Sequence, residues 1–133
     1  PPIGEVYEPA NIPGELKAMA RWSPWRAQWN DKRGKWDKIP GNQRSTAKPE
    51  TWLTFEAAQA ELQANPSTFT GLGFVVTGLP EFTFIDLDNC IDEAGSFSAR
   101  AIEIIAAVAS YTEISPSGRG LRIVARGASP TDW

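Results

Sequence analysis

The sequence has 133 residues, of which 41% are hydrophobic and 22% are charged, with a formal net charge of −3 and no histidine. This length suits one hydrophobic core, and we expect one globular domain. The lack of histidine excludes His-based acid–base catalysis and the usual zinc sites, so any chemistry must use carboxylates, hydroxyls, Arg, Lys and added metal. The negative charge argues against coating of nucleic acid by bulk electrostatics.

Cysteine content and hydropathy indicate where the protein works. The single cysteine, Cys90, cannot form an internal disulfide, which favours a reducing compartment, and we expect a cytoplasmic protein. No apolar run approaches the roughly 18 residues that a membrane span needs, so no membrane partner is expected. The chain starts without Met and without a signal-peptide pattern, which indicates a fragment of a longer protein.

The first predicted elements are an arm and a hairpin. Residues 1–14 contain four prolines and little periodicity, so we expect an extended arm or linker before a domain over 15–133. Alternation of tryptophans with polar residues then predicts a hairpin, with strands over 25–29 and 36–39 and its turn at 30–34.

Two helices are predicted further along the chain. Thr54 is a suitable N-cap for a helix that runs through Ala64. A second helix is expected over 98–109, because Ile102 and Ile105 fall on a single stripe there.

Four further strands complete the predicted architecture. Residues 71–77 and 82–87 are two β-rich runs separated by a short Gly/Pro turn, which suggests adjacent antiparallel strands at the centre of the sheet. Residues 111–115 and 121–125 are expected to be strands around the turn 116–120. The order of elements predicts an α+β fold, with a mostly antiparallel sheet and helices packed on one face.

The strand that ends in Asp-Leu-Asp is the most informative segment. Asp86 and Asp88 point the same way because side chains alternate along a strand, while Leu87 faces the core. Two carboxylates at a strand end suit Mg²⁺ or Mn²⁺, which prefer oxygen ligands and share them with substrate phosphates. Two such ions would clamp the attacking oxygen and the leaving pyrophosphate of nucleotidyl transfer. The alternative is a solvated turn without metal.

The turn that follows combines hydroxyls, glycines and arginine, and we expect its backbone N–H groups to approach a bound anion. These candidate nucleotide-binding residues are Ser115, Ser117, Gly118, Arg119 and Gly120. On the returning strand, Arg122 faces away from Leu121 and Ile123. Its planar guanidinium is suited to clamp a triphosphate. The alternative is a glycine-rich β-turn with arginines on a solvated face.

Two weaker sets of candidates lie in the first half of the chain. A basic loop over 41–48 suggests contact with triphosphate or template, through Lys38, Arg44 and Ser45, or else it is simply solvated. Four tryptophans either stack on the bases of a single strand or belong to the core, namely Trp22, Trp25, Trp29 and Trp36.

Residues 84–90, the helix after them and residues 111–123 together resemble the bifunctional primase-polymerase domains of phage and plasmid replication proteins, in the archaeo-eukaryotic primase superfamily. The likeness covers about residues 20–127. It implies a catalytic sheet like that of an RNA-recognition motif, with Asp86 and Asp88 as metal ligands. It also implies nucleoside triphosphates and a single-stranded DNA template as substrates, and a fused or separate helicase as a partner.

The sequence departs from the family pattern in two places. The second motif of the family falls on Gly120-Leu121-Arg122, where Arg122 replaces the usual His. No acidic strand follows Arg126, and Asp132 lies in a loop-like stretch. Three explanations remain open: the chain ends before the third carboxylate, Glu113 substitutes for it as a metal ligand, or the domain binds without catalysing.

Three functions follow from these features. The first is a DNA primase/polymerase that performs template-directed nucleotidyl transfer with two metal ions. The second is a non-catalytic replication module that binds nucleotide or single-stranded DNA. The third is a metal-dependent nuclease that uses the same carboxylates.

Overall fold

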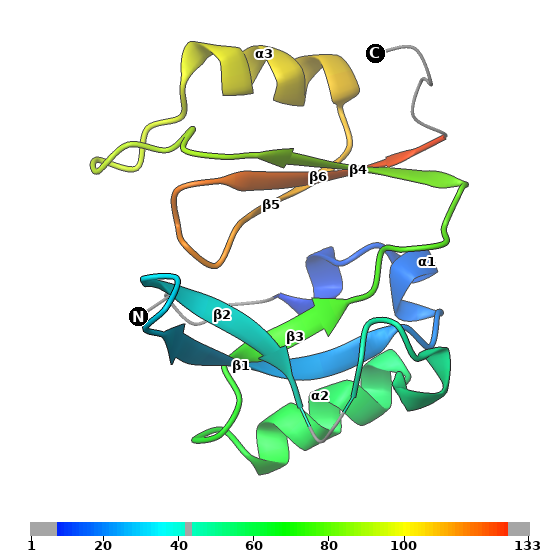
Figure 1. Cartoon of the computed structure of the whole chain (residues 1–133). Coiled ribbons are helices and arrows are strands. Elements are labelled where there is room, and N and C mark those ends of the chain that lie inside the picture. The colour runs from blue at the N-terminus through cyan, green and yellow to red at the C-terminus, as the bar shows by residue number, and fades with distance from the viewer. Residues whose placement is uncertain (1–7, 42–43, 128–133) are drawn as a thin grey trace. The chain divides into compact units, whose positions relative to one another are not determined.

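The computed structural model describes residues 8–41 and 44–127. The chain divides into two compact units, Pro1–Thr77 and Gly78–Trp133, each built on one three-stranded antiparallel sheet (Figure 1). The predicted α+β class with antiparallel strands is confirmed, although the strands form two sheets and not the single sheet expected. The predicted domain boundary at residue 15 stays a prediction.

Helices long and apolar enough to cross a bilayer are not found among the described residues.

The sheet of the first unit has the strand order β2-β1-β3. Its strands are β1 (Trp22–Asn30), β2 (Lys35–Pro40) and β3 (Gly71–Phe74). Strands β1 and β2 form the predicted hairpin, in which Trp29 lies opposite Trp36. The turn needs the left-handed backbone of Gly34, which has φ of 61°.

Helix α2 (Phe55–Ala64) packs on this sheet through the apolar residues of its first turns. Thr54 is the N-cap, as predicted, because its side chain accepts a hydrogen bond from the backbone N–H of Ala57. Phe55 and Ala58 are buried, and the ring of Trp22 meets the Phe55 ring edge to face, with centroids 5.0 Å apart. The core of this unit therefore forms where α2 covers Trp22 of β1.

Shorter helices complete the first unit: η1 (Pro9–Asn11), α1 (Gly14–Lys17) and η2 (Pro49–Thr51). The described part of the predicted arm contains η1, and Ile12 is buried. Leu16 is buried as well, and its carbonyl accepts a hydrogen bond from the Trp22 indole at 3.0 Å. Residues 1–7 lie outside the described residues.

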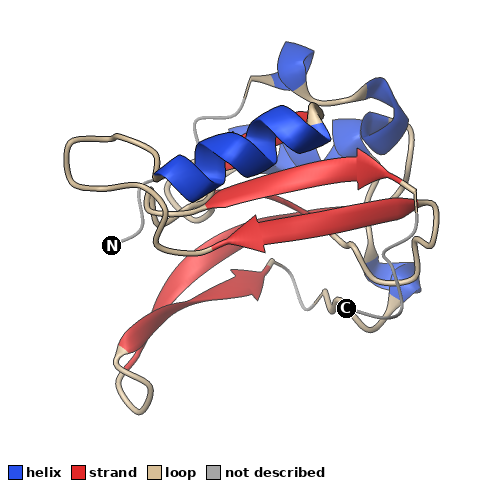
Figure 2. Ribbon diagram, turned by 90° about the horizontal axis from the view of Figure 1, so that it is seen from above, coloured by secondary structure: helices blue, strands red, loops and turns tan. Residues whose placement is uncertain are grey.

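The sheet of the second unit has the order β4-β6-β5, from β4 (Phe82–Leu87), β5 (Tyr111–Ile114) and β6 (Leu121–Arg126). Helix α3 (Ala99–Val108) covers one face of it, as Figures 1 and 2 both show. The apolar cluster beneath the helix contains Ala101 and Leu121, with Leu87 and Ile105 packed against it. Ser98 caps α3 by accepting a hydrogen bond from the backbone N–H of Ala101.

The predicted pairing of residues 71–77 with residues 82–87 is wrong. Strands β3 and β4 lie in different sheets, and each is an edge strand, so neither is at a sheet centre. Strand β3 pairs with β1, and the Arg21 guanidinium holds the segment after β3 by donating to the carbonyls of Val75 and Thr77. Strand β4 instead pairs along its whole length with β6. The turn between the runs resembles a hairpin connection, but the longer-range pairings decide the topology.

Candidate functional site

The site begins with a pair of opposite charges on adjacent strands of the second unit. Asp86 of β4 lies directly opposite Arg122 of β6, and the Arg122 Nε donates to Asp86 Oδ1 at 3.0 Å. Because side chains alternate, both residues project from the face opposite the one that packs under α3. The Asp86 side chain is 64% exposed and that of Arg122 is 35% exposed. This carboxylate and guanidinium are therefore accessible to a ligand.

Glu113 extends the pair to the third strand. It lies opposite Arg122 in the pairing of β5 with β6, and its Oε1 is 3.8 Å from Arg122 Nη1. The other oxygen, Oε2, accepts a hydrogen bond of 2.9 Å from the Tyr111 hydroxyl. We call Asp86, Arg122 and Glu113 the charged row. In this row one cation lies between two carboxylates that come from the strands on either side.

Asp88 lies just beyond the end of β4, in an exposed turn. The next residue, Asn89, has a left-handed backbone with φ of 52°, a conformation that asparagine tolerates better than most residues. Among the described residues, no group of three or more His, Cys, Asp or Glu side chains is gathered as a metal site. The assignment of metal to Asp86 and Asp88, with Glu113 as a further ligand, therefore stays a prediction. Asp132 lies outside the described residues.

The loop between β5 and β6 is attached to the end of β4. The Arg119 carbonyl accepts hydrogen bonds from the backbone N–H groups of Cys90 and Ile91, at 2.9 and 3.0 Å. Gly120 comes so near that a Cβ there would lie 2.8 Å from the Leu87 carbonyl oxygen. The structure thus brings the predicted nucleotide-binding loop against the segment that carries the two aspartates.

The backbone N–H groups of Gly118, Arg119 and Gly120 are used within the loop itself. Gly118 donates to the Ser115 carbonyl at 2.8 Å, and Arg119 donates to Ser117 Oγ at 3.2 Å. Gly120 donates to Ser115 Oγ at 3.2 Å, and the two serine hydroxyls lie 3.0 Å apart. In this conformation a phosphate would meet the serine hydroxyls and the exposed Arg119 side chain before it met backbone donors. That differs from the anion cradle expected from the glycines.

The candidates in the first unit have structural contacts of their own. Arg44 forms a bidentate ion pair with Glu61, in which Nη1 donates to Oε1 at 3.0 Å and Nη2 donates to Oε2 at 2.7 Å. Both side chains are mostly buried. The Ser45 carbonyl accepts a hydrogen bond from the Trp52 indole at 2.9 Å. The Lys38 ammonium lies 4.3 Å from the centre of the Trp25 ring. Contact of these residues with nucleotide stays a prediction, and the geometry of Arg44 suits a structural role.

A double-mutant cycle tests that role of Arg44. Arg44→Gln is expected to destabilise the first unit by about 1–3 kcal/mol, because it leaves the Glu61 carboxylate without its charged donor. Adding Glu61→Gln should recover part of the loss. Urea unfolding of the two single variants and the double variant gives the coupling energy. Additive effects would show that the two groups do not act as a pair.

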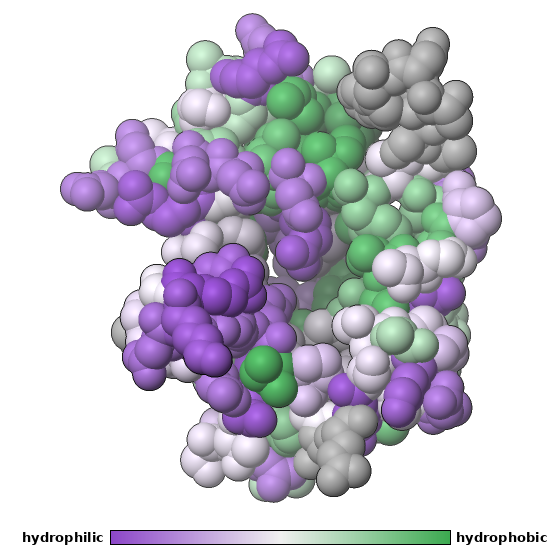
Figure 3. All heavy atoms as spheres, in the orientation of Figure 1, coloured by the Kyte–Doolittle hydropathy of each residue, from purple (hydrophilic) through white to green (hydrophobic). Residues whose placement is uncertain are grey.

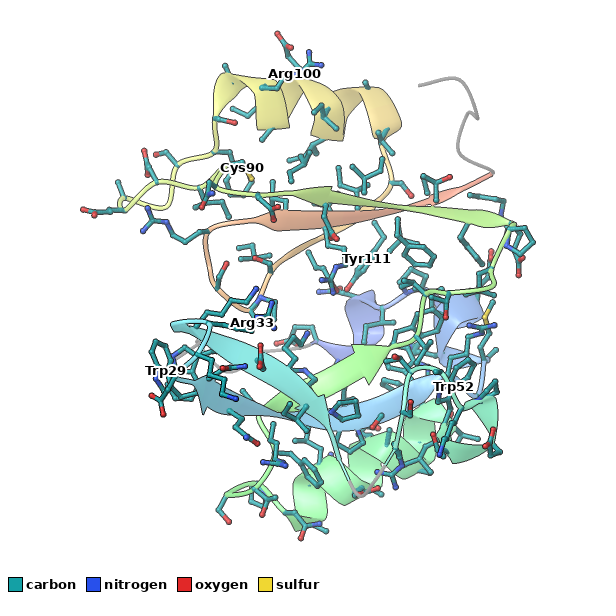
Figure 4. All side chains as sticks on the ribbon, viewed as in Figure 1. Trp29, Arg33, Trp52, Cys90, Arg100 and Tyr111 are labelled. Carbon is teal, nitrogen blue, oxygen red and sulfur yellow. The ribbon has the colours of Figure 1, made fainter. Side chains whose placement is uncertain are left out.

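The sequence motifs did not indicate Tyr111 as part of the site. Its hydroxyl holds one oxygen of Glu113, as described above, and so fixes the direction of that carboxylate. The sequence could have indicated this contact, because residues 111 and 113 are two apart on a predicted strand and their side chains share a face. Figure 4 labels Tyr111 beneath the sheet of the second unit and Arg100 on the far side, on α3.

Comparison with known proteins supports the family resemblance. No protein-family model matches the chain. A DNA primase-polymerase of Nitratiruptor phage NrS-1 is 38% identical over 121 residues, which cover 86% of this chain. The chain spans 16% of the length of that protein. This relationship confirms the resemblance to phage primase-polymerases that the motifs predict.

Proposed function

From this relationship to a phage primase-polymerase we propose that the chain is the nucleotide-binding part of a DNA primase/polymerase. In this proposal Asp86 and Asp88 bind a divalent metal, Mg²⁺ or Mn²⁺, and Arg122 contacts the triphosphate. The observation that carries it is the 3.0 Å pairing of Asp86 with Arg122 at a strand end. A carboxylate and a guanidinium on one face can bind the cation and the anion of a metal–triphosphate complex together.

Each side chain has a distinct role in the proposed reaction. The metal would neutralise the triphosphate and stabilise charge on the leaving pyrophosphate. Arg122 would orient the phosphates, because its planar guanidinium matches a pair of phosphate oxygens. Glu113 and Tyr111 would hold Arg122 in place from the neighbouring strand. Ser115, Ser117 and Arg119 would contact the triphosphate from the loop, while Lys38, Arg44 and Ser45 are the weaker candidates for such contacts.

The ion pair of Asp86 with Arg122 also supports a second candidate, a non-catalytic module that binds nucleotide or single-stranded DNA. In the charged row Arg122 already supplies a positive charge beside Asp86, at the place where a polymerase would hold metal. The two candidates differ in what they predict for metal. A polymerase needs the ion for both binding and reaction, whereas a binding module can hold a triphosphate through Arg122 alone. A helicase, fused or separate, is a proposed partner in either case.

Calorimetry of triphosphate binding distinguishes these candidates. We expect dATP to bind in the presence of Mn²⁺ and to be released by EDTA. Arg122→Gln should weaken binding by about tenfold or more, the size expected for a charge-assisted hydrogen bond. Arg122→Lys should retain part of the affinity. Binding that is indifferent to EDTA and to both substitutions would contradict the polymerase proposal.

Template-directed activity is the next measurement. The proposal expects a primed template and dNTPs to give extension that depends on Mn²⁺ or Mg²⁺. Metal-dependent binding of triphosphate with no extension by the longer protein would favour the non-catalytic module. Cleavage of DNA without added nucleotide would favour a nuclease instead.

A further inference from the structure

The end of the β1–β2 hairpin carries two exposed tryptophans. Trp29 and Trp36 lie opposite one another on the two strands, with ring centroids 5.6 Å apart and planes at 68°. Their exposed fractions are 47% and 41%, whereas Trp22 and Trp25 of the same sheet are at most 5% exposed. The sequence left open whether these four rings are core or binding residues. The structure separates them into one buried pair and one exposed pair.

The exposed rings are held in place by polar contacts at the turn. The Trp29 indole donates to Asp31 Oδ1 at 2.8 Å. Asp37 accepts from Asn30 at 2.7 Å and pairs with Arg33 at 2.8 Å. These bonds fix the turn beside the rings, and Figure 4 shows Trp29 and Arg33 at this end of the hairpin. Binding of a ligand that stacks on these rings would therefore cost little side-chain conformational entropy.

The charge around the rings is positive although the chain is acidic. Five basic and two acidic residues lie between positions 26 and 38, while the whole chain has a net charge of −3. Lys32, Arg33 and Lys35 of this stretch are exposed. Both acidic residues, Asp31 and Asp37, already accept the bonds described above. Figure 3 shows hydrophilic residues gathered over the β1–β2 turn.

We propose that this hairpin end binds single-stranded DNA, with bases stacked on Trp29 and Trp36 and phosphates contacted by Lys32, Arg33 and Lys35. Indole rings stack on any base, and unpaired bases are the ones with faces available. Basic side chains around them supply the attraction for the backbone. An apolar protein partner is a poorer fit, because charged residues surround the rings. The proposal rests on the proposed function only for the use of the strand as a template.

The experiment compares variants that keep or lose a flat aromatic ring. Anisotropy of a labelled oligothymidine measures binding to the full 133-residue chain. Trp29→Leu with Trp36→Leu should weaken binding by about tenfold or more, since base stacking on an aromatic side chain has an effect of this size. Trp29→Phe with Trp36→Phe should retain most of the affinity. Leucine keeps an apolar side chain but has no aromatic ring, so a difference in affinity between the two double variants reports base stacking.

Charge variants test the phosphate contacts. Lys35→Gln should reduce the slope of log affinity against log salt by about one unit. Arg100→Gln is the matched control, because the Arg100 side chain is 81% exposed on α3 and outside the hairpin. It should leave the slope unchanged. A slope that falls equally in both variants would overturn the assignment of phosphate contacts to the hairpin.

Three results would overturn the proposal as a whole. The first is parental affinity in the leucine double variant, and the second is a duplex that competes as well as the single strand. The third is self-association of the parent chain that the leucine changes abolish without weakening strand binding, which would make the surface an interface between copies. Oligothymidine binding is measured without triphosphate and triphosphate binding without DNA, so failure of the triphosphate proposal and failure of this one are distinguishable.

Discussion

Asp86→Asn and Asp88→Asn are each expected to reduce Mn²⁺-dependent binding of dATP by at least about 100-fold. Residues that only hydrogen-bond a metal ligand already contribute about 10- to 100-fold to metal affinity, and loss of a direct ligand should cost no less. Each change removes one negative charge near the end of β4, from the strand itself for Asp86 and from the turn after it for Asp88. Calorimetry with and without Mn²⁺ measures the effect.

The two aspartate variants separate metal binding from positioning of Arg122. Asp86 contacts the Arg122 guanidinium, so Asp86→Asn also alters the charged row. Asp88 lies in the turn beyond β4, and its variant tests the metal more directly. Asp37→Asn is the control, because Asp37 also forms an ion pair with an arginine, at 2.8 Å, on the other unit. Equal losses in all three variants, or none in any, would contradict a metal site at the end of β4.

Gly120→Ala is expected to destabilise the second unit by about 2 kcal/mol or more, within the range known for overpacking of a closely packed site. The added methyl group would lie 2.8 Å from the Leu87 carbonyl oxygen, which belongs to the backbone and cannot turn aside as a side chain can. The loop would have to move away from the end of β4. Triphosphate affinity should fall with it, since the loop carries Ser115, Ser117 and Arg119.

Hydrogen exchange resolves this effect within one unit. We expect faster exchange at the amides of β4 and β6 in Gly120→Ala and unchanged exchange in β1. Gly14→Ala is the control, because a Cβ at Gly14 meets no atom within 4 Å. Unchanged protection in β4 and β6 would show that residue 120 has more room than the structure gives it.

Local patterns predicted the elements well because they depend on neighbouring residues. Thr54 caps its helix as predicted from residue type and position, and the helix expected from about residue 98 begins next to Ser98, which is its cap. Alternation along β6 also predicted that Arg122 faces away from Leu121, and Leu121 is buried in the cluster under α3 whereas the Arg122 side chain is 35% exposed. These are properties of a few consecutive side chains, which a sequence displays directly.

Strand pairing was harder, because it depends on residues far apart in the chain. The four residues after Thr77 look like a hairpin turn, yet β3 joins β1 and β4 joins β6. The segment after β3 is also held by a residue far away in the chain, Arg21, which donates to the carbonyls of Val75 and Thr77. No window of a few residues contains both members of such a pair, so propensity alone favoured the wrong neighbours.

The sequence indicated several residues of the candidate site, but it did not indicate which of them contact one another. Asp86 and Arg122 were recognised from strand pattern and family resemblance, and the structure brings them within hydrogen-bonding distance. The contacts of Glu113 and Tyr111 in the charged row could not be predicted in the same way, because they depend on the register of β5 against β6. The glycines of the loop suggested open backbone donors, whereas Ser115 and Ser117 accept those hydrogen bonds. Serines in a tight turn commonly bond to nearby backbone in this way.

The β5–β6 loop is attached to the end of β4 through the Arg119 carbonyl and not through the Arg119 side chain. Both hydrogen bonds from Cys90 and Ile91 end on the peptide oxygen, so the anchoring of the loop does not require an arginine at this position. The exposed side chain can be exchanged for one of different length or charge while the backbone stays where it is. Under the proposed function, residue 119 is therefore a position where substitutions are expected to change ligand choice while the fold is kept.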